Sequence, residues 1–122
     1  MSDETVWLAD GVDIATLPKV SLHDHLDGGL RPGTVLELLE SDDIAIPESV
    51  ASSGDVRAMT SDEFAAWVVR QSESGSLVDY LKTFDLTCAV MQTEKGLERV
   101  AREAVLDLAA DGVIYGELRW AP

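Results

Sequence analysis

The two histidines of this chain stand one residue apart, within the stretch SLHDHLDGG that runs from Ser21 to Gly29. His23, His25 and Asp27 occupy alternate positions in it. Side chains at alternate positions of a β-strand point to the same face and lie about 6.6 Å apart along it. Two neutral imidazoles so placed can bind one metal ion such as zinc, and Asp27 would continue the same face towards a ligand. The spacing therefore predicts half of a metal site.

Two interpretations of the histidine pair stay open at this point. H-x-H also occurs without any metal, where a half-buried imidazole only finds a hydrogen-bond partner. Gly28 and Gly29 follow directly, which places the pair at the end of a strand, where the sites of α/β proteins lie. Catalytic zinc, however, generally needs three protein ligands and an open position. Because the chain has no third histidine, further ligands would be carboxylates or lie beyond Pro122.

The elements that would hold this pair follow from hydrophobic periodicity and from end signals. Lys19 to Leu26 alternates as a strand does, before the Gly-Gly pair. A loop is expected over 41–55, and Glu98 and Arg102 are spaced for an ion pair on a helix. Helices are expected from Pro32, from Thr60 with Glu63 in a capping box, from Leu77 after the break at 74–76, and from Thr93 to Gly112, with a second strand from Val113 to Trp120.

This order of strand, helices and strand is typical of a βαβ unit with a parallel sheet. The connection is longer than one crossover needs, so roughly residues 30–90 are expected to be an insertion at the carboxyl end of the first strand. Two strands do not complete a parallel sheet, which normally has more strands and is covered on both faces. We therefore expect residues 1–122 to be a single partial domain of a larger α/β protein.

Several other side chains leave two interpretations open. Phe64, Trp67, Tyr80 and Phe84 have helical spacing, which is typical of a core, although some of them could line a pocket above the first strand. Glu117 and Arg119 share a strand face and could pair inside a barrel, for structure or for a site. Asp24 points to the face opposite the histidines, where the sequence gives no partner for its charge.

Composition excludes several functional classes. The net charge of −14, from 23 acidic and 9 basic residues, disfavours binding to nucleic acid through a basic face. The apolar runs are too short for a membrane span, and no secretory signal is visible at the start. Cys88 is the single cysteine, which agrees with a reducing compartment. We expect a cytoplasmic protein without nucleic-acid or membrane partners.

The stretch LPKVSLHDHLDGGLRPGTVLELL strongly resembles the amino-terminal part of the adenosine deaminase family, in the metal-dependent amidohydrolase superfamily. That family opens its barrel with P-K-x-x-L-H-x-H-L-D-G, which Pro18 to Gly28 match. LVDYLKTFDL and GVIYGELRWAP are similar to a later helix and to the second strand of the same family. The resemblance extends from about residue 17 to 122, and its first motif is the specific one.

The resemblance implies the amino-terminal part of a (β/α)₈ TIM barrel, namely its first two strands plus inserted helices, with a zinc ion at the carboxyl-terminal face. His23 and His25 would bind the zinc, and His25 would also contact the substrate. Asp27 would bind a ribose hydroxyl, and Gly28 would let the chain pass close to the nucleoside. An apolar lid near the ribose would contain Tyr80, Leu81 and Phe84.

The implied reaction is zinc-dependent hydrolytic deamination of adenosine, and of deoxyadenosine, to inosine and ammonia in purine salvage. It is catalysed by a hydrolase that acts on the C–N bonds of cyclic amidines. The family's catalytic glutamate and its remaining zinc ligands match no residue of this chain, so no catalytic residue is assigned here. The 122 residues alone are therefore expected to be inactive and to need the rest of the barrel to complete the site.

Three alternatives remain. Adenine deaminases of the same superfamily resemble H-x-H-L-E-G at this motif, whereas the shorter Asp27 leaves room for a ribose hydroxyl. A phosphoesterase barrel can also begin with H-x-H, but it gives no reason for the L-D-G that follows. The chain could also be a non-catalytic truncated remnant that keeps the signature of the fold. The other class of zinc deaminases, with H-x-E and P-C-x-x-C, is excluded because Cys88 is alone.

Overall fold

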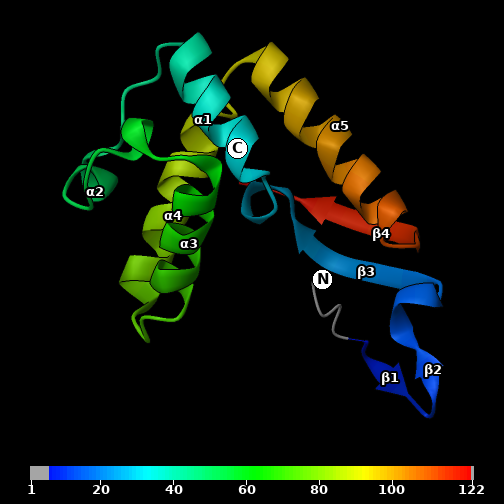
Figure 1. Ribbon diagram of the computed structural model, residues 1–122. Coiled ribbons are helices and arrows are strands. Elements are labelled where there is room, and N and C mark those ends of the chain that lie inside the picture. The colour runs from blue at the N-terminus through cyan, green and yellow to red at the C-terminus, as the bar shows by residue number, and fades with distance from the viewer. Residues whose placement is uncertain (1–5, 122) are drawn as a thin grey trace.

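The computed structural model describes residues 6–121. Figure 1 shows a pair of strands beside one long helix, and a group of shorter helices at the end to which both strands point. The paired strands are β3 (Lys19–His25) and β4 (Val113–Arg119), and the long helix is α5 (Glu94–Ala110). The shorter helices are α1 (Pro32–Ser41), α2 (Glu48–Ala51), α3 (Ser61–Ser72) and α4 (Leu77–Ala89).

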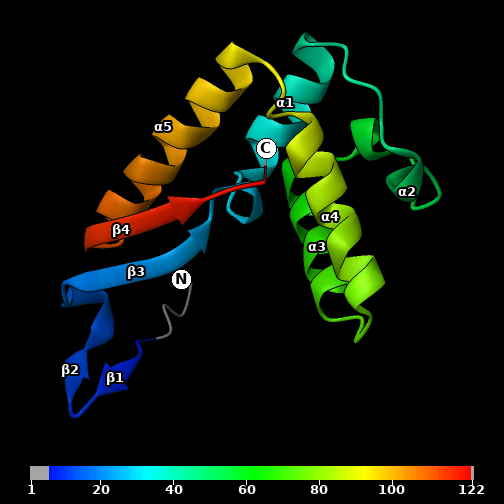
Figure 2. The same cartoon turned by 180° about the vertical axis from the view of Figure 1, so that it is seen from behind.

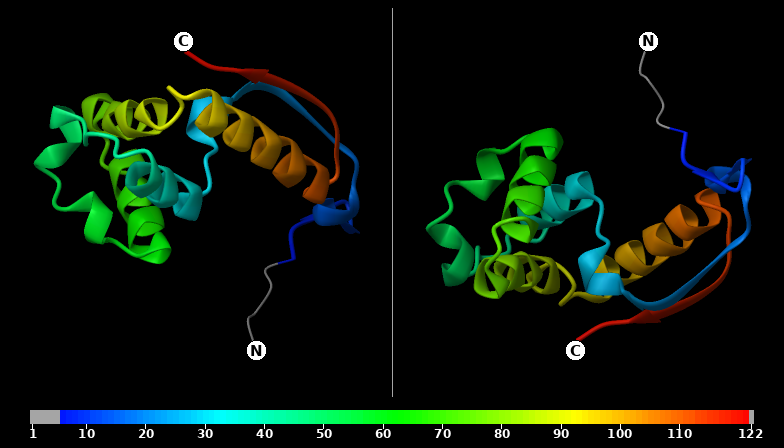
Figure 3. Two further views of the ribbon diagram at one scale, coloured as in Figure 1. Left: turned by 90° about the horizontal axis from the view of Figure 1, so that it is seen from above. Right: turned by 90° about the horizontal axis from the view of Figure 1, so that it is seen from below.

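The β3–α5–β4 part is the predicted βαβ unit. β3 and β4 pair in parallel, and in the views from above and below α5 lies along one face of the pair (Figure 3). Gly112 ends the helix with a φ of +74°, a backbone conformation that glycine adopts without steric cost. Its carbonyl oxygen then accepts a 3.0 Å hydrogen bond from the Lys19 amide. The predicted insertion is also confirmed, because α1 to α4 all follow the carboxyl end of β3.

The alternation predicted for the first strand is wrong in its second half. The strand register jumps from Ser21 opposite Gly116 to Asp24 opposite Leu118. His23 lies inside this irregularity with a φ of +56°, in the left-handed region that non-glycine residues rarely adopt. A bulge of this kind redirects side chains, so the rule of alternate faces does not hold across it.

The strand also ends earlier than predicted. β3 stops at His25, and Leu26–Gly28 forms a 3₁₀ turn. Leu26 and Asp27 are both buried there, so Asp27 does not continue a strand face. β4 likewise ends at Arg119, one residue short of the predicted Trp120.

The structure confirms the helix starts that the sequence predicted from proline and from capping residues. Pro32 opens α1 in its first turn. Thr60 caps α3, and the backbone and side chains of Thr60 and Glu63 make both hydrogen bonds of the capping box. Thr93 accepts a hydrogen bond from the Gly96 amide and caps α5. The predicted loop over 41–55, in contrast, contains the short helix α2, which buries Val50 completely.

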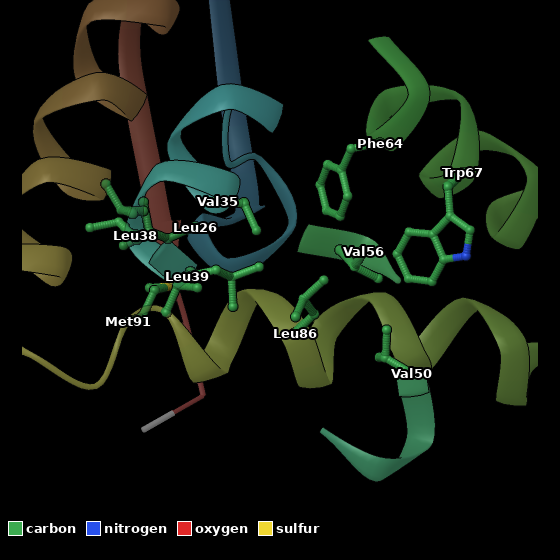
Figure 4. Close-up of a cluster of buried hydrophobic side chains, with 12 residues drawn as sticks. Leu26, Val35, Leu38, Leu39, Val50, Val56, Phe64, Trp67, Leu86 and Met91 are labelled. Atoms are coloured by element: carbon green, nitrogen blue, oxygen red, sulfur yellow. The ribbon is translucent and has the colours of Figure 1, made fainter. Parts of the chain in front are cut away.

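The main hydrophobic core lies among the inserted helices rather than under the sheet. Figure 4 shows Leu86 of α4 between the side chains of α1 and those of α3 and the segment around Val56. Phe64 and Trp67 stack with ring centroids 5.6 Å apart and are 2% exposed. For these two aromatic residues the core interpretation is correct. The remaining members of this core are Leu26, Val35, Leu38, Leu39, Val50, Val56, Val90, Met91 and Val100.

Ion pairs and hydrogen bonds connect α1 and the residue before it to α5. Arg31, just before α1, makes a bidentate ion pair with Asp107, with Nη2 2.6 Å from Oδ1. Thr34 donates a 2.6 Å hydrogen bond to Glu103, which also pairs with Arg99. The predicted pair of Glu98 and Arg102 does not form among the described residues. The helix face that carries Arg99 and Glu103 makes the contacts instead, because it faces α1.

A small hairpin precedes the barrel strands and was not predicted. β1 (Leu8–Ala9) and β2 (Val12–Asp13) pair antiparallel. Asp10 and Gly11 between them have φ values of +51° and +81°, as the tight two-residue turns of hairpins require. Seen from behind, the hairpin lies at the end of β3 that is remote from α1 to α4 (Figure 2). No helix within residues 6–121 is both long and apolar enough to cross a membrane.

Candidate functional site

A pocket of about 690 Å³ lies where the end of β3 meets the inserted helices. One wall comes from the strand end and the turn after it, and the other comes from one face of α4. This places the pocket at the carboxyl end of the parallel strands, as expected for α/β folds. It is lined by Asp24, His25, Asp27, Gly28, Gly29, Tyr80, Leu81, Phe84, Asp85, Cys88 and Ala121.

The two histidines lie next to each other at the end of β3, and one of them lines this pocket. The ring centroids of His23 and His25 are 5.2 Å apart, with the rings tilted by 54°, and both side chains are exposed. The pair is brought together by the bulge at His23 and not by the regular pleat of a strand. Only His25 lines the pocket itself, whereas His23 borders a separate hollow with Glu117, Leu118 and Arg119.

Asp27 is the buried charged group of the site. It belongs to the 3₁₀ turn and lines the pocket, although it is only 4% exposed. Its Oδ2 atom lies 3.8 Å from Cys88 Sγ and accepts a 3.5 Å hydrogen bond from the Ala121 amide. His25 Nδ1 lies 3.4 Å from Oδ1 without forming a hydrogen bond to it. Within the described chain, Oδ1 is therefore a buried oxygen without a hydrogen-bond partner.

The structure gives Asp24 the partner that the sequence did not. Asp24 Oδ2 accepts a 2.9 Å hydrogen bond from the Ser21 hydroxyl, and the residue is half-buried. The bulge turns Asp24 back towards Ser21, three positions earlier in the strand. The carboxylate thereby borders the pocket without being buried unpaired.

α4 supplies the apolar wall. Tyr80 and Phe84 make an edge-to-face pair with centroids 5.2 Å apart, and Leu81 beside them is 49% exposed. Phe84 lies four positions after Tyr80 and three after Leu81, so its side chain neighbours both of them on the helix surface. For Tyr80 and Phe84 the pocket interpretation is correct.

Gly28 lies between the end of β3 and the ring of Phe84. A Cβ atom at Gly28 would lie 3.4 Å from Phe84 Cε1 and 3.5 Å from Cζ, which are ordinary van der Waals distances. Packing within this chain therefore does not by itself require glycine here. Gly28 lines the pocket, where its missing side chain leaves room for a ligand.

Several lining residues of the pocket were not predicted as site residues, among them Asp85 and Cys88. Asp85 lines the pocket and accepts a 2.6 Å hydrogen bond from Ser49. Cys88 lies one turn after Phe84 and contacts Asp27. Burial, the negative charge of Asp27 and the hydrogen bond to it all raise the pKa of the Cys88 thiol. Its place on the helix face of Tyr80 and Phe84 was the available signal, since those residues are eight and four positions away.

The pair of Glu117 and Arg119 that the sequence suggested does not form. Glu117 accepts a 3.1 Å hydrogen bond from the Tyr115 hydroxyl. Arg119 instead reaches across to β3, where its Nη1 atom lies 2.9 and 3.0 Å from the two ring nitrogens of His23. The parallel register explains this contact, because Arg119 lies opposite His25 and next to the bulge.

The histidines fit a metal ion as part of its ligand set only. Neutral imidazoles suit zinc and similar metals, and the Asp27 carboxylate near His25 Nδ1 could hold that ring as carboxylates do around metal-bound histidines. Arg119 would have to leave His23 for that ring to bind a cation. Across residues 6–121, no three side chains of His, Cys, Asp or Glu come together in a way that could hold a metal.

Comparisons with known proteins agree on one family. Residues 18–122 match the sequence model described as "Adenosine deaminase". An adenosine deaminase of Mycobacteroides abscessus is 49% identical over 113 residues, which cover 93% of this chain and 29% of that protein. Adenosine deaminase 1 of Streptomyces coelicolor is 48% identical over 109 residues, covering 89% and 25%. The chain thus spans less than a third of the length of these relatives.

Solved structures show the same relationship. The crystal structure of an Arabidopsis N6-mAMP deaminase matches with a TM-score of 0.61 and 31% identity, over 89% of this chain and 29% of that one. Arabidopsis ADAL complexed with IMP matches with a TM-score of 0.60 and 32% identity, over 89% and 28%. The α/β fold described above corresponds to the amino-terminal part of the TIM-barrel-like domain of such deaminases. The chain belongs to the adenosine deaminase family.

Proposed function

We propose that this chain forms the amino-terminal part of a zinc-dependent deaminase that hydrolyses adenosine, and also deoxyadenosine, to inosine and ammonia. The observation that carries the proposal is Asp27, a buried carboxylate that lines the pocket together with His25. Its Oδ1 atom has no hydrogen-bond partner in the described chain. A buried acceptor without a donor is costly. A hydroxyl group of a bound ligand would remove that cost.

His23 and His25 are the residues that would hold the zinc, together with ligands from outside this chain. The bound metal would supply a hydroxide at neutral pH by lowering the pKa of its water. The residues described here bind and orient the substrate. Asp27 accepts a hydrogen bond from a ribose hydroxyl, and His25 contacts the substrate beside it. Gly28 keeps the turn close to the pocket.

The α4 wall would take the apolar parts of the nucleoside. Tyr80 and Phe84 already pair edge to face, and Leu81 extends the wall while half of it is exposed. Covering these side chains by a sugar or a base removes apolar surface from water, which favours binding. The wall and Asp27 together explain an affinity for a molecule with one apolar and one hydroxylated part.

The charges of the pocket favour a nucleoside over a nucleotide. The Arabidopsis N6-mAMP deaminase is named for a monophosphate, and the Arabidopsis ADAL structures hold IMP and GMP. In this chain the lining residues include Asp24, Asp27 and Asp85 but no Lys or Arg among those described. A phosphate dianion would meet carboxylates where it needs cations or hydrogen-bond donors. We therefore infer an uncharged ribose as the preferred partner.

The site needs the remainder of a barrel. Apolar side chains of both strands stay exposed, with Leu22 at 63% and Ile114 at 75%, and each strand has one unpaired edge. The further zinc ligands and the catalytic acid would also come from there. The 122 residues alone would accordingly show no turnover. We place the complete enzyme in cytoplasmic purine salvage, in keeping with a small nucleoside substrate.

The experiment is a substrate comparison with the full-length protein. Adenosine, deoxyadenosine, AMP and adenine are each offered, and deamination is followed by the change in ultraviolet absorbance. We expect turnover of the two nucleosides, and at least tenfold lower kcat/KM for AMP and adenine. A chelator should abolish the activity and zinc should restore it. Preference for AMP would contradict the inference from charge, and chelator-insensitive turnover would contradict the metal.

A further inference from the structure

Cys88 lines the same pocket as the aromatic wall. It follows Phe84 by one helical turn on α4 and lies on the same side of the helix. Its Sγ atom is 3.8 Å from Asp27 Oδ2, within the range of a hydrogen bond to sulfur. The two residues are 61 positions apart in sequence, so only the packing of α4 against the turn brings them together.

The two oxygens of Asp27 have different surroundings. Oδ2 is held from one side by the thiol and from the other by the Ala121 amide. Oδ1 is buried, lies 3.4 Å from His25 Nδ1, and has no hydrogen-bond partner in the described chain. A carboxylate can rotate about its Cβ–Cγ bond, and its terminal torsion is broad. Donors that hold one oxygen therefore fix this torsion and set the direction in which the other oxygen can accept a hydrogen bond from a ligand.

We propose that Cys88 is a positioning residue for Asp27: its thiol donates a hydrogen bond to Oδ2 and so keeps Oδ1 directed to a ligand hydroxyl. The proposal rests on the proposed function for the identity of that ligand, an adenosine ribose, but the contact itself rests on the geometry. Cys88 touches neither the reacting atoms nor the metal ligands in this role. It acts on substrate only through Asp27.

The chemistry of the thiol suits this role. The S–H group is a weak donor, so it biases the carboxylate without neutralising it. The pKa of Cys88 is raised by burial and by Asp27, which keeps the thiol protonated and able to donate at neutral pH. A thiolate at this position would repel Asp27, and an alanine would leave a gap beside Oδ2.

Matched variants of the full-length protein test the proposal. Cys88→Ala removes the donor and Cys88→Ser keeps one. Thr87→Ala removes a hydroxyl that donates a hydrogen bond to the Phe84 carbonyl, away from Asp27. KM, kcat and the calorimetric Kd for adenosine are measured for each. We expect Cys88→Ala to raise KM and Kd about 2- to 10-fold with kcat unchanged, as for the loss of one hydrogen bond. Cys88→Ser and Thr87→Ala should stay near the parent values.

A substrate series separates positioning from mere structural support. Asp27→Asn is measured with 2′-, 3′- and 5′-deoxyadenosine, and the analogue whose Kd it leaves unchanged lacks the hydroxyl that Asp27 binds. Cys88→Ala should likewise leave the Kd for that analogue unchanged. A loss of affinity that persists for it would mean that Cys88 only supports the fold. A Cys88→Ser variant no better than Cys88→Ala would also overturn the proposal.

A measurement without any substrate keeps this inference distinct from the proposed function. Iodoacetamide alkylates cysteine through its thiolate, and peptide mass spectrometry follows Cys88 alone. Asp27→Asn removes the negative charge beside the thiol, so we expect alkylation of Cys88 to become several-fold faster. An unchanged rate would refute the contact even if adenosine is the substrate. A faster rate in a protein that does not bind adenosine would support the contact and refute the proposed function alone.

Discussion

Asp27 should lower the stability of the folded protein and at the same time contribute to substrate binding. Its buried Oδ1 atom has no partner in the described chain, and an unsatisfied buried acceptor costs about 1–3 kcal/mol. We expect Asp27→Asn to weaken adenosine binding at least tenfold, because it removes the charged acceptor. The same variant should keep or raise the free energy of unfolding, because the charge no longer needs burial. Calorimetry and urea unfolding measure the two effects.

A variant that binds adenosine more weakly but unfolds less readily indicates a residue that serves function at the expense of stability. Ser21→Ala serves as the control, since it removes a hydrogen bond to the neighbouring Asp24 without touching Asp27. It should lower stability slightly and leave adenosine affinity unaltered. A large loss of stability in Asp27→Asn would instead assign the carboxylate a structural role.

The two histidines make a separate prediction about metal content. Their ring centroids are 5.2 Å apart. If both imidazoles bind one metal ion, removing either of them should cost the site its metal. His23→Gln and His25→Gln should each reduce the zinc bound by the purified full-length protein at least tenfold, as measured by elemental analysis. Asp24→Asn should keep its zinc, because Asp24 bonds to Ser21. Full zinc occupancy in either histidine variant would remove that residue from the ligand set.

The residue types of the site could be read from the sequence, but their arrangement could not. The H-x-H spacing brought His23 and His25 forward as a pair. The bulge that joins them depends on a positive φ at His23, and no local signal in the sequence marks the position of that bulge. The burial of Asp27 and its contact with Cys88 depend on how α4 packs, which spacing along the chain does not report.

At the level of elements, the capping box of α3 should be worth a measurable part of the stability. Thr60 accepts a hydrogen bond from the Glu63 amide, and Glu63 accepts one from the Thr60 amide at 2.8 Å. Thr60→Ala should lower the free energy of unfolding by about 1 kcal/mol. Ser72→Ala, at the other end of the same helix, should change it by less than about 0.5 kcal/mol. Urea unfolding of the full-length protein compares them.

The capping box could also affect the pocket, because α3 carries Phe64 and Trp67, which pack in the core next to α4. Loosening the first turn of α3 should therefore reach the pocket wall weakly, with less than about a twofold change in KM. A strong effect on KM from Thr60→Ala would show that α3 moves with the site. Equal losses of stability in Thr60→Ala and Ser72→Ala would show that the cap contributes nothing specific.

Elements with local signals were predictable and elements defined by distant contacts were not. The helix ends at Pro32, Thr60, Thr93 and Gly112 depend on backbone geometry or hydrogen bonds within one turn, so the sequence predicted them well. α2 has no capping side chain and only four residues. It exists because Val50 is drawn into the core made by other helices. The first hairpin was missed because each of its strands has only two residues, too few for a period.

Over the whole molecule, ion pairs join the helical insertion to the βαβ unit. Hydrogen bonds from Arg31 lower the pKa of Asp107. Burial alone would raise the pKa of Glu103, but hydrogen bonds from Thr34 and Arg99 bring it below its ordinary value. Carboxylates with a lowered pKa in the folded state stabilise it above their unfolded pKa, about 4, and lose that contribution as the pH falls through the folded value.

We therefore expect the contribution of Asp107 and Glu103 to the free energy of unfolding to stay constant from about pH 7 to 5. That contribution should fall below about pH 4. Asp107→Asn should remove part of that acid dependence and cost at most about 1 kcal/mol at pH 7, because the pair is half-exposed. Unfolding in urea at several pH values, with and without 1 M salt, gives the comparison. An acid dependence identical in Asp107→Asn and the parent would show that Asp107 takes no part in it.

The parallel pairing of the two strands was predictable from the helix-to-strand turn at Gly112. Whether the sheet is covered, however, depends on the rest of the barrel. Val20, Leu22, Ile114 and Tyr115 are each more than half exposed. Exposed apolar strands of this kind pair with other chains. We therefore expect residues 1–122, expressed alone, to self-associate and to bind a hydrophobic dye, whereas the full-length protein does neither.

Charged substitutions on these strands should act in opposite directions in the two forms of the chain. Leu22→Lys and Ile114→Lys should reduce association of the 122-residue chain, because a charge on an exposed strand opposes pairing. The same variants should destabilise the full-length protein, because the side chains would then be charged where the barrel buries them. Sedimentation velocity and thermal unfolding measure the two effects. Variants that leave the full-length protein as stable as the parent would show that these strands face water in it, and the barrel would then have to close elsewhere.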